Sequence, residues 1–352
     1  MSEENSFAAE LLEVSSAGFA ALAAERLMAT QPALAARFST DATGAWRGVF
    51  SQRIVELATA LRLGEPDLFV ARVNWARRAF TAREVPEIDL RASLEVLAGV
   101  LARELPDAAR AAVAGILALA IAEFDQPAEQ QGACLDPGTE TGRLALEYLS
   151  TVLEGDSRRA TKRLLEATDG GLGVERMYLE VLVPAQQEVG RLWHAGELGI
   201  VEEHVVTQTT ERLLALLAQR AARAPANGRT VLCAAVAGNT HDIAVRVLAD
   251  FFDIAGWRSI HLGGNLPATE LATAVQYFDG ELVVLSAALS VQLPRVGDAI
   301  AAVRRLEGRE VRVMVGGLAF ADAPDVWRKL GADGYAPDAR SAVALGTELL
   351  GA

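Results

Sequence analysis

The sequence predicts a helical chain that becomes an α/β chain near residue 230. Apolar residues recur at helical spacing through residues 5–125 and again through 140–222. From residue 230 the period changes, and short apolar runs alternate with helical segments. We therefore expect an all-helical N-terminal domain, a four-helix bundle and a doubly wound parallel sheet, in that order.

The N-terminal domain is predicted from its apolar stripes and its prolines. The stretch TGAWRGVFSQRIVELATALRL places Trp46, Phe50 and Leu57 on one helical face. Further helices fit 66–84, 87–104 and 107–124, with prolines near their starts, where proline is tolerated. The polar, Pro- and Gly-rich segment 125–142 reads as a linker and a domain boundary.

The bundle and the sheet domain are separated by a second linker, RAPANGR. The bundle helices are expected at 140–155, 156–168, 173–192 and 198–222. The expected strands are TVLCAAV, RSIHLG, LVVLSA and VRVMVGG, and a last helix fits 338–350. In such a sheet, which we expect to be flavodoxin-like, a ligand binds at the carboxyl ends of the strands.

Composition narrows the class of protein. The net charge is −13, which argues against a generic nucleic-acid surface, because phosphates are bound by clustered positive charge. No apolar run reaches the ~18 residues of a membrane span, and the acidic start MSEENSFAAE is unlike a secretory signal. The two cysteines form neither a CxxC pair nor a disulfide framework. We expect a cytoplasmic protein.

One of the four histidines, His241, follows the first predicted strand. That position is the crevice at which such a sheet binds its ligand. The alternative is that Asn239 or Thr240 caps the next helix and His241 faces solvent. Glycines and serines recur after the other strands, where they leave room for a large flat ligand, although ordinary turns and caps also use them. The glycines and serines are Gly263, Gly264, Ser286, Ser290, Gly316 and Gly317, and Asn265 and Leu289 beside them are candidate contacts as well.

The order N-x-H-x-x-A, L-G-G-N-L-P, Ser286 and Gly316-Gly317 resembles the cobalamin-binding domain. The resemblance implies that His241 is the lower cobalt ligand in a base-off, His-on complex, and that the displaced tail lies along the small residues. It places Thr240, Asp242 and Ile243 at the cofactor as well. Asn239 stands where the family has a carboxylate, so we expect a weaker or more exchangeable bond to cobalt. Ala244 and Ala288 also depart from the family pattern.

The bundle carries a second motif, Trp193 followed after nine residues by Glu203-His204. It resembles the upper cap of light-responsive adenosylcobalamin proteins. The resemblance implies that Trp193 shields the upper face, that Glu203 and His204 contact the adenosyl group, and that His194 takes the upper cobalt position after photolysis. The alternative is that Trp193 lies in the bundle core and His204 on a helix surface. His261 has no matched role.

The N-terminal helices lack histidine and cysteine, which excludes the usual haem ligand and a thioether-linked bilin. Arg53 interrupts an apolar stripe, and LFVARVNWARRAF carries Arg72, Trp75 and Arg77. A buried arginine needs an anion, because an unpaired buried charge is costly. These arginines either form salt bridges to Glu or Asp on neighbouring helices, make an inter-domain contact, or bind a chromophore's propionates.

The whole layout resembles the photocobilins, or photoglobins, on the stretch ATGAWRGVFSQRIVELATALRLGEPDLFVARVNWARRAF. The resemblance implies a globin-like domain at 1–130 with non-covalent biliverdin, a cobalamin cap at 139–224 and a cobalamin-binding domain at 229–352. We expect a photoreceptor, not an enzyme, that signals through dimerisation or a separate partner. The rivals are a corrinoid methyl carrier of a methyltransferase system and a light-independent cobalamin sensor.

Overall fold

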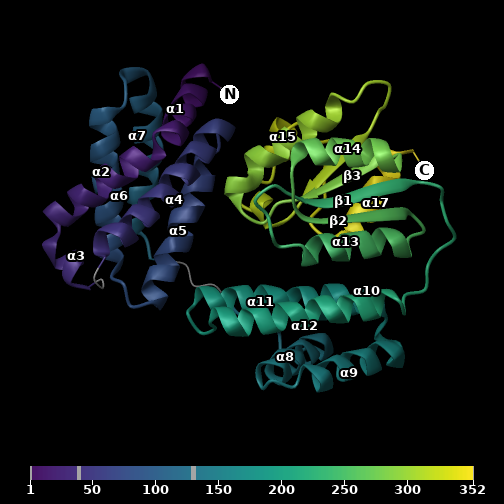
Figure 1. Ribbon diagram of the computed structural model, residues 1–352. Helices are drawn as coiled ribbons and strands as arrows, with labels where there is room; N and C mark the ends of the chain where they lie inside the picture. Colours follow the sequence, from purple (N-terminus) through teal and green to yellow (C-terminus); the bar gives the residue numbers. More distant parts are fainter. Residues whose placement is uncertain (1, 38–40, 128–131, 352) are drawn as a thin grey trace. The chain divides into compact units, whose positions relative to one another are not determined.

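The computed structural model describes residues 2–37, 41–127 and 132–351, and it divides into two compact units (Figure 1). The first unit comprises residues 1–130 together with 319–329, and the second comprises the remainder of the chain. Residues 128–131, within the predicted linker 125–142, lie outside the described residues.

The first unit is helical, as predicted. Its long helix α4 begins after Asp41, whose side chain accepts a hydrogen bond from the Gly44 N–H, and it ends at Gly64, which has a positive φ. The predicted stripe of Trp46, Phe50 and Leu57 is buried. The helices are α1 (Glu3–Val14), α2 (Ser16–Thr30), α3 (Pro32–Arg37), α4 (Ala42–Leu63), α5 (Pro66–Ala82), α6 (Glu87–Glu104) and α7 (Asp107–Ala122), followed by a 3₁₀ turn, Glu123–Asp125.

The second unit begins with four helical runs that pack against one another. The run expected at 173–192 is not a uniform α-helix: the π-helical segment Met177–Leu182 joins its two α-helical parts. Pro184 explains the wider turn, because it has no N–H to donate to the Glu180 carbonyl and its ring crowds that group. The helices are α8 (Glu140–Leu153), α9 (Ser157–Ala167), α10 (Val174–Arg176), α11 (Val183–His194) and α12 (Ile200–Ala218), with a second π segment at Thr168–Leu172.

The rest of the second unit is a five-stranded parallel sheet with the order β2-β1-β3-β4-β5. The order reverses between β1 and β3, which makes the carboxyl ends of these two strands the switch point. The strands are β1 (Thr230–Val236), β2 (Arg258–Leu266), β3 (Leu282–Ser286), β4 (Arg312–Gly316) and β5 (Gly334–Tyr335). The helices are α13 (Ile243–Ile254), α14 (Ala268–Phe278), α15 (Leu293–Arg304) and α17 (Ala339–Leu349), with a 3₁₀ turn at Ser290–Gln292 (η4). The chain between β4 and β5 also forms the 3₁₀ turn Leu318–Phe320 (η5) and the helix α16 (Val326–Lys329), and residues 319–329 of this stretch are grouped with the first unit.

Some strand boundaries differ from the prediction. β2 continues through Gly263, Gly264 and Asn265, which we had placed in the following loop. The pairing of β2 with β1 slips twice beyond Cys233, and Gly263 has a φ of 78° there, so the extra residues are taken up as bulges. Ser286 and Gly316 are the last residues of β3 and β4, so the predicted runs LVVLSA and VRVMVGG each extend one residue too far. The short β5 carries too few residues to show a pattern and was not predicted.

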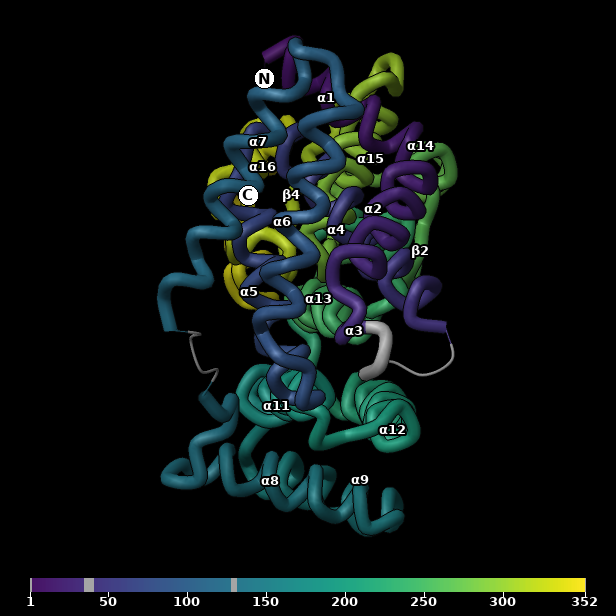
Figure 2. Tube along the Cα trace, turned by 90° about the vertical axis from the view of Figure 1, so that its left-hand side faces the viewer, coloured from purple at the N-terminus to yellow at the C-terminus, as the bar shows by residue number. Residues whose placement is uncertain are grey.

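The bundle and the sheet share one hydrophobic core. Val247 and Phe251 of α13 belong to the same cluster of buried residues as Tyr178, Leu213 and their bundle neighbours. The rings of Tyr178 and Phe251 lie 6.3 Å apart between centroids. The turn between α11 and α12 lies at the same end of this unit as the loop between β1 and α13 (Figures 1 and 2).

A search of the described residues finds no single helix with the length and apolar character of a membrane span. Only α1 and α2 taken together pass, and they are bent by 73° at their junction.

Candidate functional site

The loop between β1 and α13 carries His241 at the carboxyl end of the sheet's central strands. The His241 side chain is exposed, whereas Asn239, two residues earlier, is 0% exposed. The cap of α13 is Asp242, with no side-chain bond to the helix, so Asn239 does not serve as the helix cap. Thr240 is exposed, and Asp242 and Ile243 are partly buried.

Asn239 holds the His241 ring. Its Oδ1 lies 3.1 Å from the His241 backbone N and 3.3 Å from the ring Nδ1. Its Nδ2 donates to the Ser286 carbonyl at 3.1 Å, which ties the amide to the end of β3. Nδ1–H is then the donor, and the other ring nitrogen, Nε2, is left as a lone-pair base. No hydrogen bond reaches Nε2 from the parts of the chain that the structure describes.

The strand next to β1 closes the loop from one side. Asn265 N donates to the Asn239 carbonyl at 2.8 Å, and Asn265 Oδ1 accepts from the Gly238 N at 2.8 Å. Asn265 takes a φ of 54°, a conformation that asparagine tolerates better than most residues. A Cβ on Gly264 would lie 3.1 Å from the Asn239 carbonyl, so the glycine permits this close approach.

Glycine is required at the end of β4 as well. Gly317 has a φ of 102°, and a Cβ there would lie 2.3 Å from the Ala287 carbonyl. Gly316, Ser286 and Ser290 are buried, whereas Leu289 is exposed. Gly316 and Gly317 therefore let the strand ends pack closely. That the small residues at this edge line a groove for a ligand stays a prediction.

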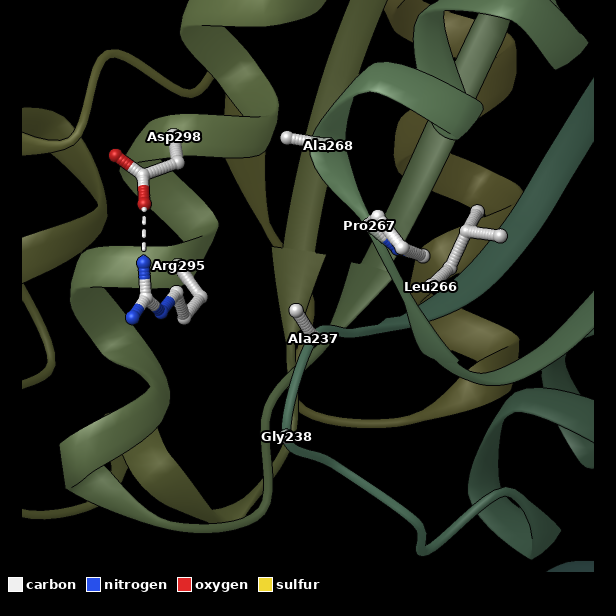
Figure 3. A pocket seen from close by; sticks show the side chains of 7 residues that line it. All are labelled: Ala237, Gly238, Leu266, Pro267, Ala268, Arg295 and Asp298. Atoms are coloured by element: carbon white, nitrogen blue, oxygen red, sulfur yellow. Dashed lines mark hydrogen bonds and ion pairs between the residues drawn. The ribbon is translucent and has the colours of Figure 1, made fainter.

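A pocket of about 420 Å³ does open at this edge, on the α14 and α15 side of the sheet (Figure 3). Leu266, Pro267 and Ala268 form one wall, and Ala237 and Gly238 lie at its base. The opposite wall is formed by Arg295 and Asp298 of α15, which are joined by a hydrogen bond of 3.2 Å from Arg295 Nη1 to Asp298 Oδ2. The lining residue nearest to His241 in the chain is Gly238, three residues before it.

The predicted cap residues lie around the turn between α11 and α12. His194 is buried at the end of α11, and Trp193 beside it is 37% exposed. At the start of α12, His204 Nδ1 lies 2.5 Å from Glu203 Oε2, and Thr207 donates to the other Glu203 oxygen at 2.8 Å. The His204 side chain is 72% exposed. The structure thus brings the four residues to one end of the bundle, with Glu203 bound to its neighbours.

Sequence reasoning missed Glu188, a buried carboxylate one turn before Arg191 on α11. Its Oε2 accepts from the Cys134 N–H at 2.7 Å, and its Oε1 accepts from Arg191 at 2.7 Å. Burial would raise the pKa of Glu188, but hydrogen bonds from Arg191 and Cys134 hold that pKa below its usual range. Its i, i+3 spacing from Arg191 was the available signal. The pair anchors the start of the second unit on α11.

In the N-terminal unit, the proposed bilin contacts are bound to carboxylates of that unit. Arg53 Nη2 lies 2.9 Å from Glu56 Oε2, and Arg72 Nε lies 3.3 Å from Glu56 Oε1. The Arg72 guanidinium also lies 4.3 Å from the centre of the Trp75 ring. Arg77 Nε lies 2.7 Å from Glu87 Oε2. Arg72 and Arg77 are thus paired with carboxylates of neighbouring helices, as one alternative had it, whereas the partner of Arg53 lies on its own helix.

The geometry at His241 suits a transition-metal ligand. An imidazole whose Nδ1–H is held presents Nε2 to a metal, and the held nitrogen fixes the tautomer. Asn239 is an uncharged amide, so it places no negative charge beside the His241 ring. A flat metal macrocycle could approach Nε2 because the side chain is exposed at the sheet edge. The donor set therefore fits a cobalt corrinoid with a single protein ligand.

Two family models match the second unit. Residues 229–344 match a B12 binding domain, and residues 144–218 match a second model that is also described as a B12 binding domain. The match covers the bundle as well as the sheet, so the two parts of the second unit are related to cobalamin proteins in the same order.

Relatives with known names are corrinoid proteins. A corrinoid protein of Desulfitobacterium hafniense (strain Y51) is 26% identical over 212 residues, which is 58% of this chain and 96% of that protein. Dimethylamine corrinoid protein 1 of Methanosarcina acetivorans is 28% identical over 211 residues, covering 58% of this chain and 97% of that protein. Dimethylamine corrinoid protein 3 of Methanosarcina mazei is 32% identical over 117 residues, covering 33% of this chain and 68% of that protein.

A solved structure shares the fold. The monomethylamine corrinoid protein of Methanosarcina barkeri superposes with a TM-score of 0.52 at 18% identity, over 59% of this chain and 98% of that one. The helical bundle followed by a parallel sheet is thus the corrinoid-protein fold. By its identity to the Methanosarcina mazei relative and by its two B12 binding domains, the chain belongs to the cobalamin-binding corrinoid protein family.

Proposed function

We propose that this protein is a corrinoid carrier that binds cobalt through His241 Nε2 and works with a separate methyltransferase. The observation that carries the proposal is that Asn239 Oδ1 binds the His241 backbone N at 3.1 Å and the ring Nδ1 at 3.3 Å, while the side chain is exposed and Nε2 is left for a metal. The named relatives support the carrier over the photoreceptor, because they are corrinoid proteins of methylamine systems. A bound cobalt corrinoid would supply a metal centre that takes up and gives away a methyl group.

The chain's own residues would bind and orient the group. His241 would ligate the metal, and Asn239 would keep its Nδ1 protonated and its ring upright. Gly264 and Gly317, which permit close backbone approaches to the Asn239 and Ala287 carbonyls, would leave room beside His241 for a flat ring. The cap residues Trp193, His194, Glu203 and His204 would cover the bound group, and the partly exposed Trp193 would shield it from water. In this role the protein presents a reactive group and does not itself catalyse the transfer.

A photoreceptor is the second candidate, and one observation favours it. The similarity to the Desulfitobacterium relative spans 58% of this chain but 96% of that protein. The N-terminal helical domain is therefore extra to the carrier. We keep as proposals its globin-like character, non-covalent biliverdin, adenosylcobalamin as the bound form, light-driven Co–C cleavage and a homodimer. We also propose domain boundaries at 1–130, 139–224 and 229–352. The flavodoxin-like description of the sheet and a cytoplasmic location are further proposals.

The ligand role of His241 is tested with aquocobalamin and the His241→Ala variant. The wild-type protein should shift bound cobalamin to the base-off, His-on absorption spectrum, and the variant should not. His261→Gln is the matched control, because His261 lies in β2 of the same sheet with its Nε2 buried. An unchanged spectrum in His241→Ala would remove His241 as the ligand.

The two candidate functions separate by what the loaded protein does. Methyl transfer from bound methylcobalamin to an acceptor, in the presence of a methyltransferase, supports the carrier. Light-dependent release of the adenosyl group with a change in oligomeric state supports the photoreceptor. Far-red absorbance after purification from cells that make biliverdin would show the bilin, and its absence in folded protein would count against it.

A further inference from the structure

Gln292 is a buried side chain that joins two loops at the carboxyl end of the sheet. It ends the 3₁₀ turn η4 after β3, and it is 5% exposed. Its Nε2 donates to the Gly238 carbonyl at 2.9 Å. Its Oε1 accepts from the backbone N–H groups of Ala288 at 2.9 Å and Leu289 at 3.0 Å. One amide thus satisfies three backbone groups from two different crossovers.

The Gly238 bond fixes the segment that leads to His241. Gly238 has a φ of 81°, and a Cβ there would meet nothing within 4 Å, so sterics alone do not hold this residue in place. Its N–H is bound by Asn265 and its carbonyl by Gln292, so both backbone groups have a side-chain partner. Asn239, which orients the His241 ring, is the next residue. A shift of Gly238 therefore moves the amide that holds the imidazole.

Gln292 also holds the segment after β3 in register with this loop. Asn239 Nδ2 donates to the Ser286 carbonyl, at the start of the same segment that Gln292 binds at Ala288 and Leu289. The two contacts together cross the switch point between β1 and β3. A hydrogen-bonded amide in a buried site is costly to disrupt, because its partners lose their bonds without gaining water.

We propose that Gln292 is a positioning residue for metal ligation: by tying the Gly238 carbonyl to the loop after β3, it sets the His241 ring for cobalt. The inference rests on the proposed function of His241. Gln292 does not touch the metal in this arrangement. Its effect appears in the fraction of bound cobalt that carries the imidazole, more than in whether the corrinoid binds at all.

The Gln292→Glu variant isolates the bond to Gly238. A carboxylate still accepts from the Ala288 and Leu289 N–H groups, but it has no N–H for the Gly238 carbonyl and places a negative oxygen against it. Gln276→Glu on the exposed surface of α14 is the matched control for the added charge. The probe is cob(II)alamin, whose electron paramagnetic resonance spectrum shows the nitrogen splitting of a coordinated imidazole.

We expect the ratio of imidazole-bound to unbound cobalt to fall by about 10-fold in Gln292→Glu, in line with the loss of an outer hydrogen-bond partner. The Kd for cob(II)alamin should change by less than this ratio, and Gln276→Glu should match the wild type in both. A purely structural role would instead lower the unfolding midpoint and leave the ratio in the folded protein unchanged, and that result would overturn the inference.

Hydrogen exchange in the apo wild-type protein provides a test that needs no variant. The amides of Ala288 and Leu289 should be protected, because the Gln292 side chain accepts from both, and the Gly238 loop should exchange faster in Gln292→Glu. Unprotected Ala288 and Leu289 amides would show that the contact is absent. If His241→Ala keeps the nitrogen splitting, His241 is not the cobalt ligand and the proposed function is wrong. If His241→Ala loses the splitting but Gln292→Glu keeps it in full, only the inference on Gln292 is wrong.

Discussion

The Tyr178 hydroxyl lies 2.8 Å from Asp250 Oδ2 and joins the helical bundle to the sheet. Tyr178 lies in the π-helical segment of the bundle, and Asp250 lies on α13, the helix that follows the His241 loop. The same hydroxyl is 3.1 Å from the Leu214 carbonyl, so its single proton is shared between the two acceptors. Burial raises the pKa of Tyr178, and the Asp250 carboxylate adds to that shift.

The first prediction is that Tyr178→Phe lowers the free energy of unfolding of the second unit by about 1–3 kcal/mol, because the half-buried Asp250 loses a donor. Urea denaturation followed by circular dichroism measures it. Asp250→Asn is the comparison, because its amide oxygen still accepts from the hydroxyl, and it should cost less. Equal stability of Tyr178→Phe and wild type would show that this hydrogen bond contributes nothing.

The second prediction concerns alkaline pH. Burial raises the pKa of Tyr148 to about 12 from 10.0, outweighing the hydrogen bond with Thr210. The folded state therefore holds this proton more tightly than the unfolded state, and the resulting stability is complete below pH 10 and is lost as the pH rises towards 12. The slope is at most about 1.4 kcal/mol per pH unit.

Tyr148→Phe removes this titration. Unfolding free energies at pH 9 and pH 11 should therefore differ less in the variant than in the wild type, although the variant is less stable at pH 7 because Thr210 loses a partner. Tyr178 remains in both proteins and leaves a residual slope. The same pH dependence in both proteins would contradict the assignment to Tyr148.

The third prediction is that Asn239→Asp strengthens the bond between His241 and cobalt. A carboxylate at the Asn239 position would accept from the ring Nδ1–H with a full negative charge, which the amide lacks, and we expect this gain to exceed the loss of the Nδ2 bond to the Ser286 carbonyl. The imidazole-bound fraction of cob(II)alamin should rise by about 10-fold or more. The electron paramagnetic resonance spectrum measures this, with Asn227→Asp on the exposed linker as the charge control. A lower bound fraction would refute the expectation.

The fourth prediction concerns the buried ion pair of the N-terminal unit. Glu56→Gln should destabilise that unit by about 3–5 kcal/mol, because it leaves the Arg53 charge buried without a counter-ion. Burial lowers the pKa of Arg53, and the nearby Glu56 carboxylate opposes that effect. Glu95→Gln, which breaks the exposed Arg91–Glu95 pair, should change stability by less than about 1 kcal/mol. Thermal and urea denaturation of the full chain compare the two variants.

The fifth prediction tests the glycine at the end of β4. Gly317→Ala should cost about 2 kcal/mol or more, because the φ of 102° is unfavourable for alanine and its Cβ would collide with the Ala287 carbonyl. Gly190→Ala on the exposed face of α11 has open space around the new Cβ, and it should raise stability by up to about 1 kcal/mol. Melting temperatures of the two variants should therefore move in opposite directions.

Much of the architecture was predictable, because each element has a local signal. The Trp46, Phe50 and Leu57 stripe marked α4, and the run TVLCAAV marked β1 to the residue. The features that the sequence did not predict depend on contacts between elements rather than on the spacing of apolar residues. β2 runs on through Gly263 and Asn265 only because it can bulge against β1, and the π segment before Pro184 has no hydrophobic signature of its own.

The site was predictable in part for the same reason. His241 stands out as a polar residue after an apolar run, so its placement follows from strand order. Gln292 gave no such signal, because its three partners are backbone groups of residues 238, 288 and 289 that no sequence pattern specifies. Arg53 shows the opposite case: its position in an apolar stripe was clear, but its partner proved to be Glu56 on the same helix rather than a carboxylate of a neighbouring helix.

The borders of the sheet have a consequence for how the protein behaves at high concentration. β2 is one edge strand of the sheet. Its backbone is irregular, because its pairing with β1 contains two register shifts and Gly263 has a positive φ. β5 forms the other border and offers only Gly334 and Tyr335. Neither edge strand offers a long, regular row of hydrogen-bonding groups to a strand of another molecule. The fold therefore disfavours edge-to-edge association into fibres.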